Sequence, residues 1–343
     1  MKKGHTGLAN LGNTCFMNAC IQVLNHTEEL TAIQKRYEKH IRPDTIESAL
    51  LREYTELRNI MTTNTGVVTP GKFVYFVHTI AQEKGRELFS GWAQNDMPEF
   101  LLFMVECMHA SISRGLSIAI SGKAQHTTDE LAIQCYTMVK DIYAKEYSEI
   151  RELFYGIYVS EIWSMDGKTR HSSKPEPFFI LDMPIPRRSN SGKPATLLDC
   201  FDLFTGTETV HGENAWYNER TGQKEDIRKR ITFWNFPNVI VISLKRFSGD
   251  GRSKMGDLVD FPMDTLDLSK YVSGYNPDSF VYELYAVCNH MGGVHGGHYT
   301  AFANNSKSGE WFHYNDTTVE HVPDRQTIVS PTAYCLFYRK KNG

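Results

Sequence analysis

The hydrophobic pattern of this chain changes character near residue 155. Upstream of that point, apolar residues recur at helical spacing in several windows, including 46–61 and 69–80. Downstream, short alternating stretches rich in β-branched and aromatic residues, including 155–163 and 239–247, are typical of strands. Helices first and strands afterwards predict an α+β fold rather than alternating βαβ units.

The composition limits the class of protein. Of 343 residues, 41% are hydrophobic and 22% are charged, and the formal net charge of −3 provides no basic field for nucleic acid or a membrane surface. No apolar run reaches the length of a membrane span, and residues 1–6 lack the apolar core of a signal peptide. The seven cysteines are scattered and odd in number, which favours free thiols in a reducing compartment. We therefore expect an intracellular monomer, cytoplasmic or nuclear, without nucleic-acid or membrane partners.

A candidate nucleophile lies in the stretch 7–18. Helical spacing begins at Cys15, and the preceding Gly12-Asn13-Thr14 has turn and helix-capping chemistry. A cysteine at a helix start faces backbone N–H groups and the positive end of the helix dipole, which predicts a lowered thiol pKa. Asn10 and Asn13 carry amide donors that could face an oxyanion. The alternative is a buried structural cysteine, because free cysteine is among the most buried residue types.

A candidate base and its orienting group lie near the other end of the chain. His298 follows a glycine-rich stretch at 292–297, and Asn315 and Asp316 follow an aromatic stretch at 311–314. A nucleophilic cysteine needs a base, and the base needs a group that fixes its orientation. Adjacent strand residues point to opposite faces, so either Asn315 or Asp316 can face His298 from a regular strand, but not both.

These stretches resemble the signature boxes of the ubiquitin-specific proteases, which are papain-like deubiquitinating enzymes. Residues 236–247 resemble a further box, so the resemblance covers nearly the whole chain. It implies a single catalytic domain, 1–343, shaped like a hand with a helical thumb, β fingers and a β-rich palm. The thumb would take about 1–150, the fingers about 155–245 and the palm about 246–343, with the cleft between thumb and palm.

The resemblance also implies the reaction and the partners. Cys15 would attack the bond between the C-terminal glycine of ubiquitin and a lysine, His298 would move the proton, and Asn315, or alternatively Asp316, would orient His298. Asn10 matches the family's oxyanion donor, while Asn13 is expected to shape the turn. The partners would be ubiquitin and ubiquitinated proteins. Two alternatives stay open, namely a protease for another ubiquitin-like modifier and a catalytically weak relative that binds ubiquitin.

Two further segments carry expected contacts with substrate. Asp96 and Glu99 read locally as a variant capping box at a helix start, and they also match an acidic pair that meets arginines of the ubiquitin tail in the family. Capping and arginine binding compete for the oxygens of Asp96, so tail contact is the stronger expectation for Glu99. Gly296 and Gly297 would let the backbone close over a tail ending in two glycines, although a plain hairpin turn explains them equally well.

The fingers depart from the family pattern. Many members carry two Cys-x-x-Cys pairs that bind a structural zinc, but between Cys135 and Cys288 this chain has only Cys200. A site of four cysteines is therefore excluded there. We expect no zinc and no cofactor, and we expect strand pairing and apolar contacts, with Trp163, Trp216 and Trp234 as candidates, to hold the fingers together.

Overall fold

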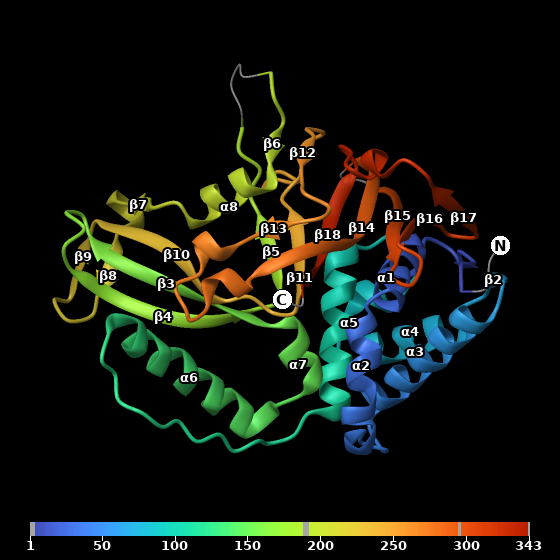
Figure 1. The fold of residues 1–343 in the computed structure, drawn as a ribbon, viewed down its shortest axis with the longest axis horizontal. Helices are drawn as coiled ribbons and strands as arrows, with labels where there is room; N and C mark the ends of the chain where they lie inside the picture. Colours follow the sequence, from blue (N-terminus) through green and yellow to red (C-terminus); the bar gives the residue numbers. More distant parts are fainter. Residues whose placement is uncertain (1–3, 188–191, 294–295, 342–343) are drawn as a thin grey trace.

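The computed structural model describes residues 4–187, 192–293 and 296–341. In this part of the chain, helices dominate up to residue 154 and strands dominate afterwards, which confirms the α+β prediction (Figure 1). The helices are α1 (Cys15–Asn25), α2 (Glu28–Tyr37), α3 (Ile46–Thr63), α4 (Gly71–Glu83), α5 (Met97–Ile112), α6 (Thr127–Glu146), α7 (Glu149–Phe154) and α8 (Leu197–Thr205). The chain is divided between α6 and α7 near residue 147, because Ser148 accepts a hydrogen bond from Arg151 N and starts a new helix.

The largest sheet has the strand order β17-β16-β15-β14-β18-β11-β5, and β13 pairs with β14 beside this path. Its strands are β5 (Ile180–Met183), β11 (Val239–Leu244), β13 (Leu266–Asp267), β14 (Val281–Gly293), β15 (Gly296–Asn305), β16 (Glu310–Asn315), β17 (Thr318–Val322) and β18 (Ala333–Lys340). The last of these in the sequence, β18, lies between β14 and β11 in the middle of the sheet. Among the described strands of this sheet, β5 alone runs parallel to its neighbour, β11.

The helix α1 lies between this sheet and the other helices. Ten of its eleven residues are buried, and it packs against β15, β14 and α5. Apolar residues of α1, α3, α4 and α5 and of the adjoining face of the sheet form one continuous core. A helix buried on nearly every side keeps a fixed position, so the residue at its start is fixed relative to β15.

A second sheet extends to one side, with the strand order β4-β3-β10-β7 (Figure 1). Its strands are β3 (Gly156–Ser164), β4 (Arg170–Phe178), β7 (Glu208–Val210) and β10 (Ile227–Asn235). Three short pairs complete the strands: β1 (Thr6–Leu8) with β2 (Gly66–Val68), β6 (Ala195–Thr196) with β12 (Val259–Asp260), and β8 (Trp216–Asn218) with β9 (Gln223–Glu225). Residues 155–245 thus supply strands to both main sheets.

The three tryptophans expected to hold the second sheet have different surroundings. Trp234 is buried against α6. Trp163 lies beneath the guanidinium of Arg230, which also binds the buried Glu161 at 2.6 Å. Trp216 stacks on His171 with ring centroids 5.6 Å apart. An ion pair and ring contacts therefore accompany the strand pairing in this sheet.

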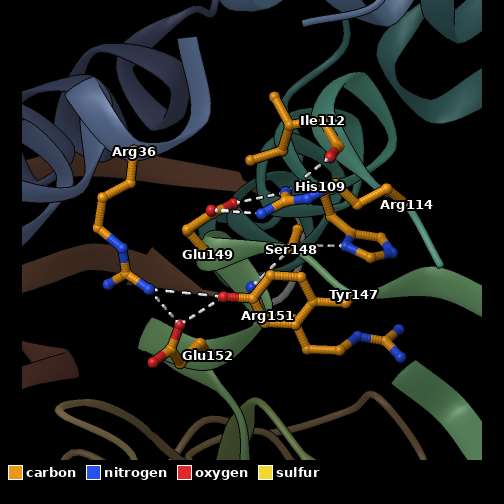
Figure 2. A network of polar contacts seen from close by, with 9 residues as sticks. All are labelled: Arg36, His109, Ile112, Arg114, Tyr147, Ser148, Glu149, Arg151 and Glu152. Atoms are coloured by element: carbon orange, nitrogen blue, oxygen red, sulfur yellow. Dashed lines mark hydrogen bonds and ion pairs between the residues drawn. The ribbon is translucent and has the colours of Figure 1, made fainter. Parts of the chain in front are cut away.

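A polar network fastens α7 to α5 and α2 (Figure 2). The buried Glu149 accepts two hydrogen bonds from Arg114, at 2.7 and 2.9 Å. Arg36 and the Tyr147 hydroxyl both bind Glu152 at 2.8 Å. These contacts fix the point at which the chain leaves the helical part and enters β3, because α7 ends directly before that strand.

Candidate active site

The loop before Cys15 is held in shape by Asn10. The Asn10 Oδ1 atom accepts hydrogen bonds from the backbone N–H groups of Gly12, at 3.0 Å, and Thr14, at 3.2 Å. Gly12 and Asn13 both have positive φ, +112° and +54°, which is the left-handed turn that glycine and asparagine tolerate. The helix then begins at Cys15, as the sequence predicted.

The expected lowering of the Cys15 pKa is wrong. Only 3% of Cys15 is exposed, and this burial raises the pKa of its thiol above the ordinary value. A hydrogen bond with the backbone of Tyr299 offsets part of the rise, and the negative charge of Asp316 adds to it. Burial raises the pKa more than the helix start lowers it, because removing a thiolate from water destabilises it more than the helix dipole stabilises it.

His298 and Asn315 come from neighbouring antiparallel strands, β15 and β16. The distance between His298 Nε2 and Asn315 Oδ1 is 2.7 Å. An amide oxygen only accepts hydrogen bonds, so Nε2 carries the proton in this contact and Nδ1 is left with a free lone pair. Neutral His298 therefore has its basic nitrogen turned away from Asn315.

The thiol and the imidazole lie on adjoining elements. The backbone of Tyr299, the residue directly after His298, reaches the Cys15 thiol, and α1 packs along β15. Residues from the beginning and the last quarter of the chain thus meet at one place. This is the juxtaposition that a cysteine nucleophile and a histidine base require.

Asp316 has a different set of contacts from Asn315. Its φ is +47°, and its two carboxylate oxygens accept from Asn10 Nδ2 at 2.9 Å and from Asn18 Nδ2 at 2.8 Å. Its backbone oxygen accepts from Leu8 N at 2.8 Å. Of the two orienting groups that the sequence left open, Asn315 is the one bonded to His298, while Asp316 joins the loop and the helix on either side of Cys15.

The backbone of the first strand also lies close to the turn that carries Asp316. A Cβ atom at Gly7 would lie 2.4 Å from the backbone oxygen of Thr317, so a side chain there would push apart the first strand and the turn that carries Asp316. Asn13, expected to shape the turn, donates from Nδ2 to the backbone oxygen of Trp92 at 2.9 Å. The loop is therefore tied on both sides by groups distant in sequence.

Asp96 caps helix α5, as its capping-box pattern predicted. Its Oδ1 accepts from Glu99 N at 3.2 Å, and its Oδ2 accepts from the hydroxyls of Tyr334, at 2.7 Å, and Tyr299, at 3.3 Å. Burial raises the pKa of this carboxyl, although these donors lower it in part. With both oxygens already bonded, Asp96 has little capacity left for another cation, whereas Glu99 is exposed.

No sequence pattern identified the partner of Gly297. Its N–H donates to Gln94 Oε1 at 2.9 Å, so the segment before α5 is bonded directly to the hairpin that precedes His298. A Cβ atom at Gly297 would lie 2.3 Å from His290 Nε2, which explains the need for glycine. Gly296, beside it, also lies against Gln94. Val294 and His295, within the glycine-rich stretch 292–297, are outside the described residues.

A lysine and a histidine that sequence reasoning missed support the same hairpin. Lys254 Nζ donates to the backbone oxygens of His290, at 2.7 Å, and Gly292, at 3.1 Å, and lies 2.9 Å from His290 Nδ1. Burial, with the charge of Lys254, lowers the pKa of His290 to about 4. His290 is thus neutral at pH 7 and accepts the lysine's third hydrogen bond.

Among residues 4–187, 192–293 and 296–341, no group of three or more His, Cys, Asp or Glu side chains is arranged to hold a metal ion. Within the same ranges, no helix is both long and apolar enough to cross a membrane. The described cysteines are all free.

Comparison with known proteins gives consistent matches over the whole chain. The family model described as "Ubiquitin carboxyl-terminal hydrolase" matches residues 6–338. The chain is 32% identical to ubiquitin carboxyl-terminal hydrolase Usp2 of Drosophila melanogaster, 34% to ubiquitin carboxyl-terminal hydrolase 2 of Bos taurus and 33% to ubiquitin carboxyl-terminal hydrolase 21 of Homo sapiens. Each match covers 98% of this chain, but only 35%, 55% and 61% of the respective relative.

Solved structures share the fold. The SAGA Ubp8/Sgf11/Sus1/Sgf73 DUB module bound to ubiquitin aldehyde has a chain that matches with a TM-score of 0.75 and 22% identity, over 99% of this chain and 70% of that one. The yeast SAGA DUB module with a variant Sgf73 matches with a TM-score of 0.73 and 24% identity, over 99% and 69%.

Proposed function

Because this chain belongs to the ubiquitin carboxyl-terminal hydrolase family, we propose that it is a cysteine-type deubiquitinase. It cleaves the isopeptide or peptide bond after the C-terminal glycine of ubiquitin, and residues 1–343 act as one catalytic domain. The observation that carries the proposal is the 2.7 Å contact between His298 and Asn315, together with the contact between the Cys15 thiol and the backbone of Tyr299, the residue after His298.

The first half of the reaction uses the unprotonated His298 Nδ1. It takes the proton of the Cys15 thiol as the sulfur attacks the carbonyl carbon of the terminal glycine. Because the resting thiol is protonated, this transfer accompanies attack instead of preceding it. The carbon–sulfur bond forms, the carbon–nitrogen bond breaks, and His298 returns the proton to the leaving lysine amine. A thioester between Cys15 and ubiquitin remains.

The second half releases ubiquitin. His298 takes a proton from water, the hydroxide oxygen bonds to the thioester carbon, and the sulfur leaves and regains a proton. Asn315 keeps His298 in the required tautomer by accepting from Nε2–H. In both halves, the Asn10 amide is the donor for the oxyanion: one of its two N–H bonds is held by Asp316, which leaves the other for the substrate.

Contacts with ubiquitin follow from the exposed groups beside this centre. Glu99 is the acidic group available for arginines of the ubiquitin tail, while Gly296 and Gly297 border the passage for its terminal glycines. Asp96 acts mainly by holding α5 against Tyr299 and Tyr334. We further propose that the protein is a monomer in the cytoplasm or nucleus, which its free thiols favour.

Labelling with ubiquitin-propargylamide tests the proposal. The wild type should form a covalent adduct, and Cys15→Ala should form none. His298→Ala should lose turnover of a ubiquitin–aminomethylcoumarin conjugate while keeping its affinity for ubiquitin. No adduct with the wild type would defeat the enzyme assignment and leave a ubiquitin-binding relative. Adduct formation only with a probe made from another ubiquitin-like modifier would assign that modifier as the substrate.

A further inference from the structure

An aromatic surface lies beside the nucleophile loop. Tyr75, in α4, is 65% exposed and Trp92, in the segment before α5, is 53% exposed. Side chains of this size are mostly buried in folded proteins, and exposed apolar groups that gather at one place mark interaction sites. Neither side chain is needed to fill the core.

The surface is continuous with the loop that carries Asn10 and Asn13. Tyr75 and His78 lie one turn apart on α4, and the His78 ring meets the Trp92 ring edge-on, with centroids 4.7 Å apart at 84°. The Trp92 ring covers Gly12, where an added Cβ would lie 3.6 Å from ring atom Cε3. Burial lowers the pKa of His78, so the surface formed by Tyr75, His78 and Trp92 is uncharged at pH 7.

The segment 92–99 connects this surface to the residues around the proposed active site. Glu99 is exposed at one end, Asp96 binds Tyr299 and Tyr334, and Gln94 binds Gly297. Under the proposed function, the ubiquitin tail follows this wall from Glu99 past Gly297 towards Cys15. Trp92, two residues before Gln94, lies against Gly12 of the loop that precedes Cys15, which places it beside the end of this path.

We infer that the surface formed by Tyr75, His78 and Trp92 binds the ubiquitin that supplies the lysine. The inference rests on the proposed function. It concerns the same active site, on the side where the lysine amine leaves. An uncharged aromatic surface suits an apolar patch on a folded protein, and aromatic side chains dominate the energetics of such contacts. The surface therefore helps decide which ubiquitin chains are cleaved.

The test compares two substrates. Ubiquitin–aminomethylcoumarin has a small leaving group and no acceptor protein, whereas di-ubiquitin has both ubiquitins. The readout is kcat/KM for each di-ubiquitin that the wild type cleaves, divided by kcat/KM for the coumarin conjugate. We expect this ratio to fall about tenfold in Trp92→Ala and about threefold in Tyr75→Ala, as for loss of a central and a peripheral contact.

Tyr75→Ala complements Trp92→Ala, because Trp92 lies against Gly12 of the nucleophile loop, whereas the Tyr75 ring packs edge-on against Phe76 of its own helix. Leu203→Ala is the matched control, because Leu203 is 48% exposed on α8 and should leave the ratio unchanged. An unchanged ratio in both aromatic variants overturns the inference, and so does a wild type that cleaves the coumarin conjugate but no di-ubiquitin. No turnover of the coumarin conjugate by the wild type would count against the proposed function instead.

Discussion

Asp316 and Asn10 are joined by a hydrogen bond of 2.9 Å, although 306 positions separate them in the sequence. The other carboxylate oxygen of Asp316 holds Asn18 in α1 at 2.8 Å. One side chain therefore fixes both the loop before Cys15 and the helix after it. Asn10 can present its remaining N–H in one direction only as long as this carboxylate is in place.

We predict that Asp316→Ala lowers kcat about 10- to 1,000-fold, because the oxyanion donor loses its fixed orientation. KM should change little, and ubiquitin affinity measured in the Cys15→Ala background should be unaffected. Asp316→Asn keeps one acceptor oxygen, so its kcat should lie between those of the wild type and Asp316→Ala. Steady-state kinetics with the coumarin conjugate measure this, and a folded Asp316→Ala enzyme with normal kcat would show that Asn10 does not depend on Asp316.

Burial of Cys15 predicts the pH dependence of its reactivity in the free enzyme. The pKa of the thiol is raised, so the thiol is protonated at pH 7 and the thiolate fraction grows only as pH rises past the ordinary cysteine range. Alkylation by iodoacetamide, measured as the difference between wild type and Cys15→Ala, should be slow at pH 7 and rise with pH through pH 9. A rate that is high and flat between pH 6 and 8 would indicate a resting thiolate.

Substitutions of Asp96 and Glu99 are predicted to have different effects, Asp96→Ala on stability and Glu99→Ala on substrate binding. Asp96→Ala removes a helix cap and leaves two tyrosine hydroxyls without their acceptor, which should cost about 2–4 kcal/mol of unfolding free energy. Glu99→Ala should change stability by less than about 0.5 kcal/mol, as expected for an exposed residue, and should raise KM for ubiquitin substrates. Urea denaturation and kinetics of both variants test this, and an unchanged KM in Glu99→Ala would remove its assigned contact.

The Arg114–Glu149 pair predicts a stability change that depends on pH. Burial alone raises the pKa of the Glu149 carboxyl, but hydrogen bonds and charges led by Arg114 bring it below its ordinary value. The pair therefore contributes stability above the unfolded-state pKa, and this contribution is lost as pH falls through the lower folded-state pKa.

Glu149→Gln should accordingly destabilise the protein by about 1–3 kcal/mol at pH 7, less than the roughly 3–5 kcal/mol for breaking a fully buried pair, because Arg114 is partly exposed. The difference from wild type should shrink below about pH 4. The exposed pair Arg86–Glu106 offers a control, since Glu106→Gln should cost less than about 0.5 kcal/mol. A difference that is constant from pH 7 to pH 3 would contradict the assignment.

Local patterns predicted the parts of the site that depend on neighbouring residues. Spacing placed the helix start at Cys15 and the cap at Asp96, and the chain order pointed to His298 with either Asn315 or Asp316 as its orienting group. The contacts of Gln94 with Gly297 and of Lys254 with His290 had no such signature, because each joins segments whose approach depends on the folded chain. The Cys15 pKa was mispredicted for the same reason: its sign depends on how deeply α1 is buried.

The central position of β18 bears on how this protein is made. A ribosome delivers residues 333–340 after β14 and β11, yet only β18 connects these two strands, because it pairs with one of them on each side. Until that segment emerges, the growing polypeptide holds two incomplete half-sheets with open edges, which are the surfaces that chaperones shield and that lead to aggregation. A nascent chain stalled short of residue 333 should therefore be inactive and insoluble, even though it already contains Cys15, His298 and Asn315.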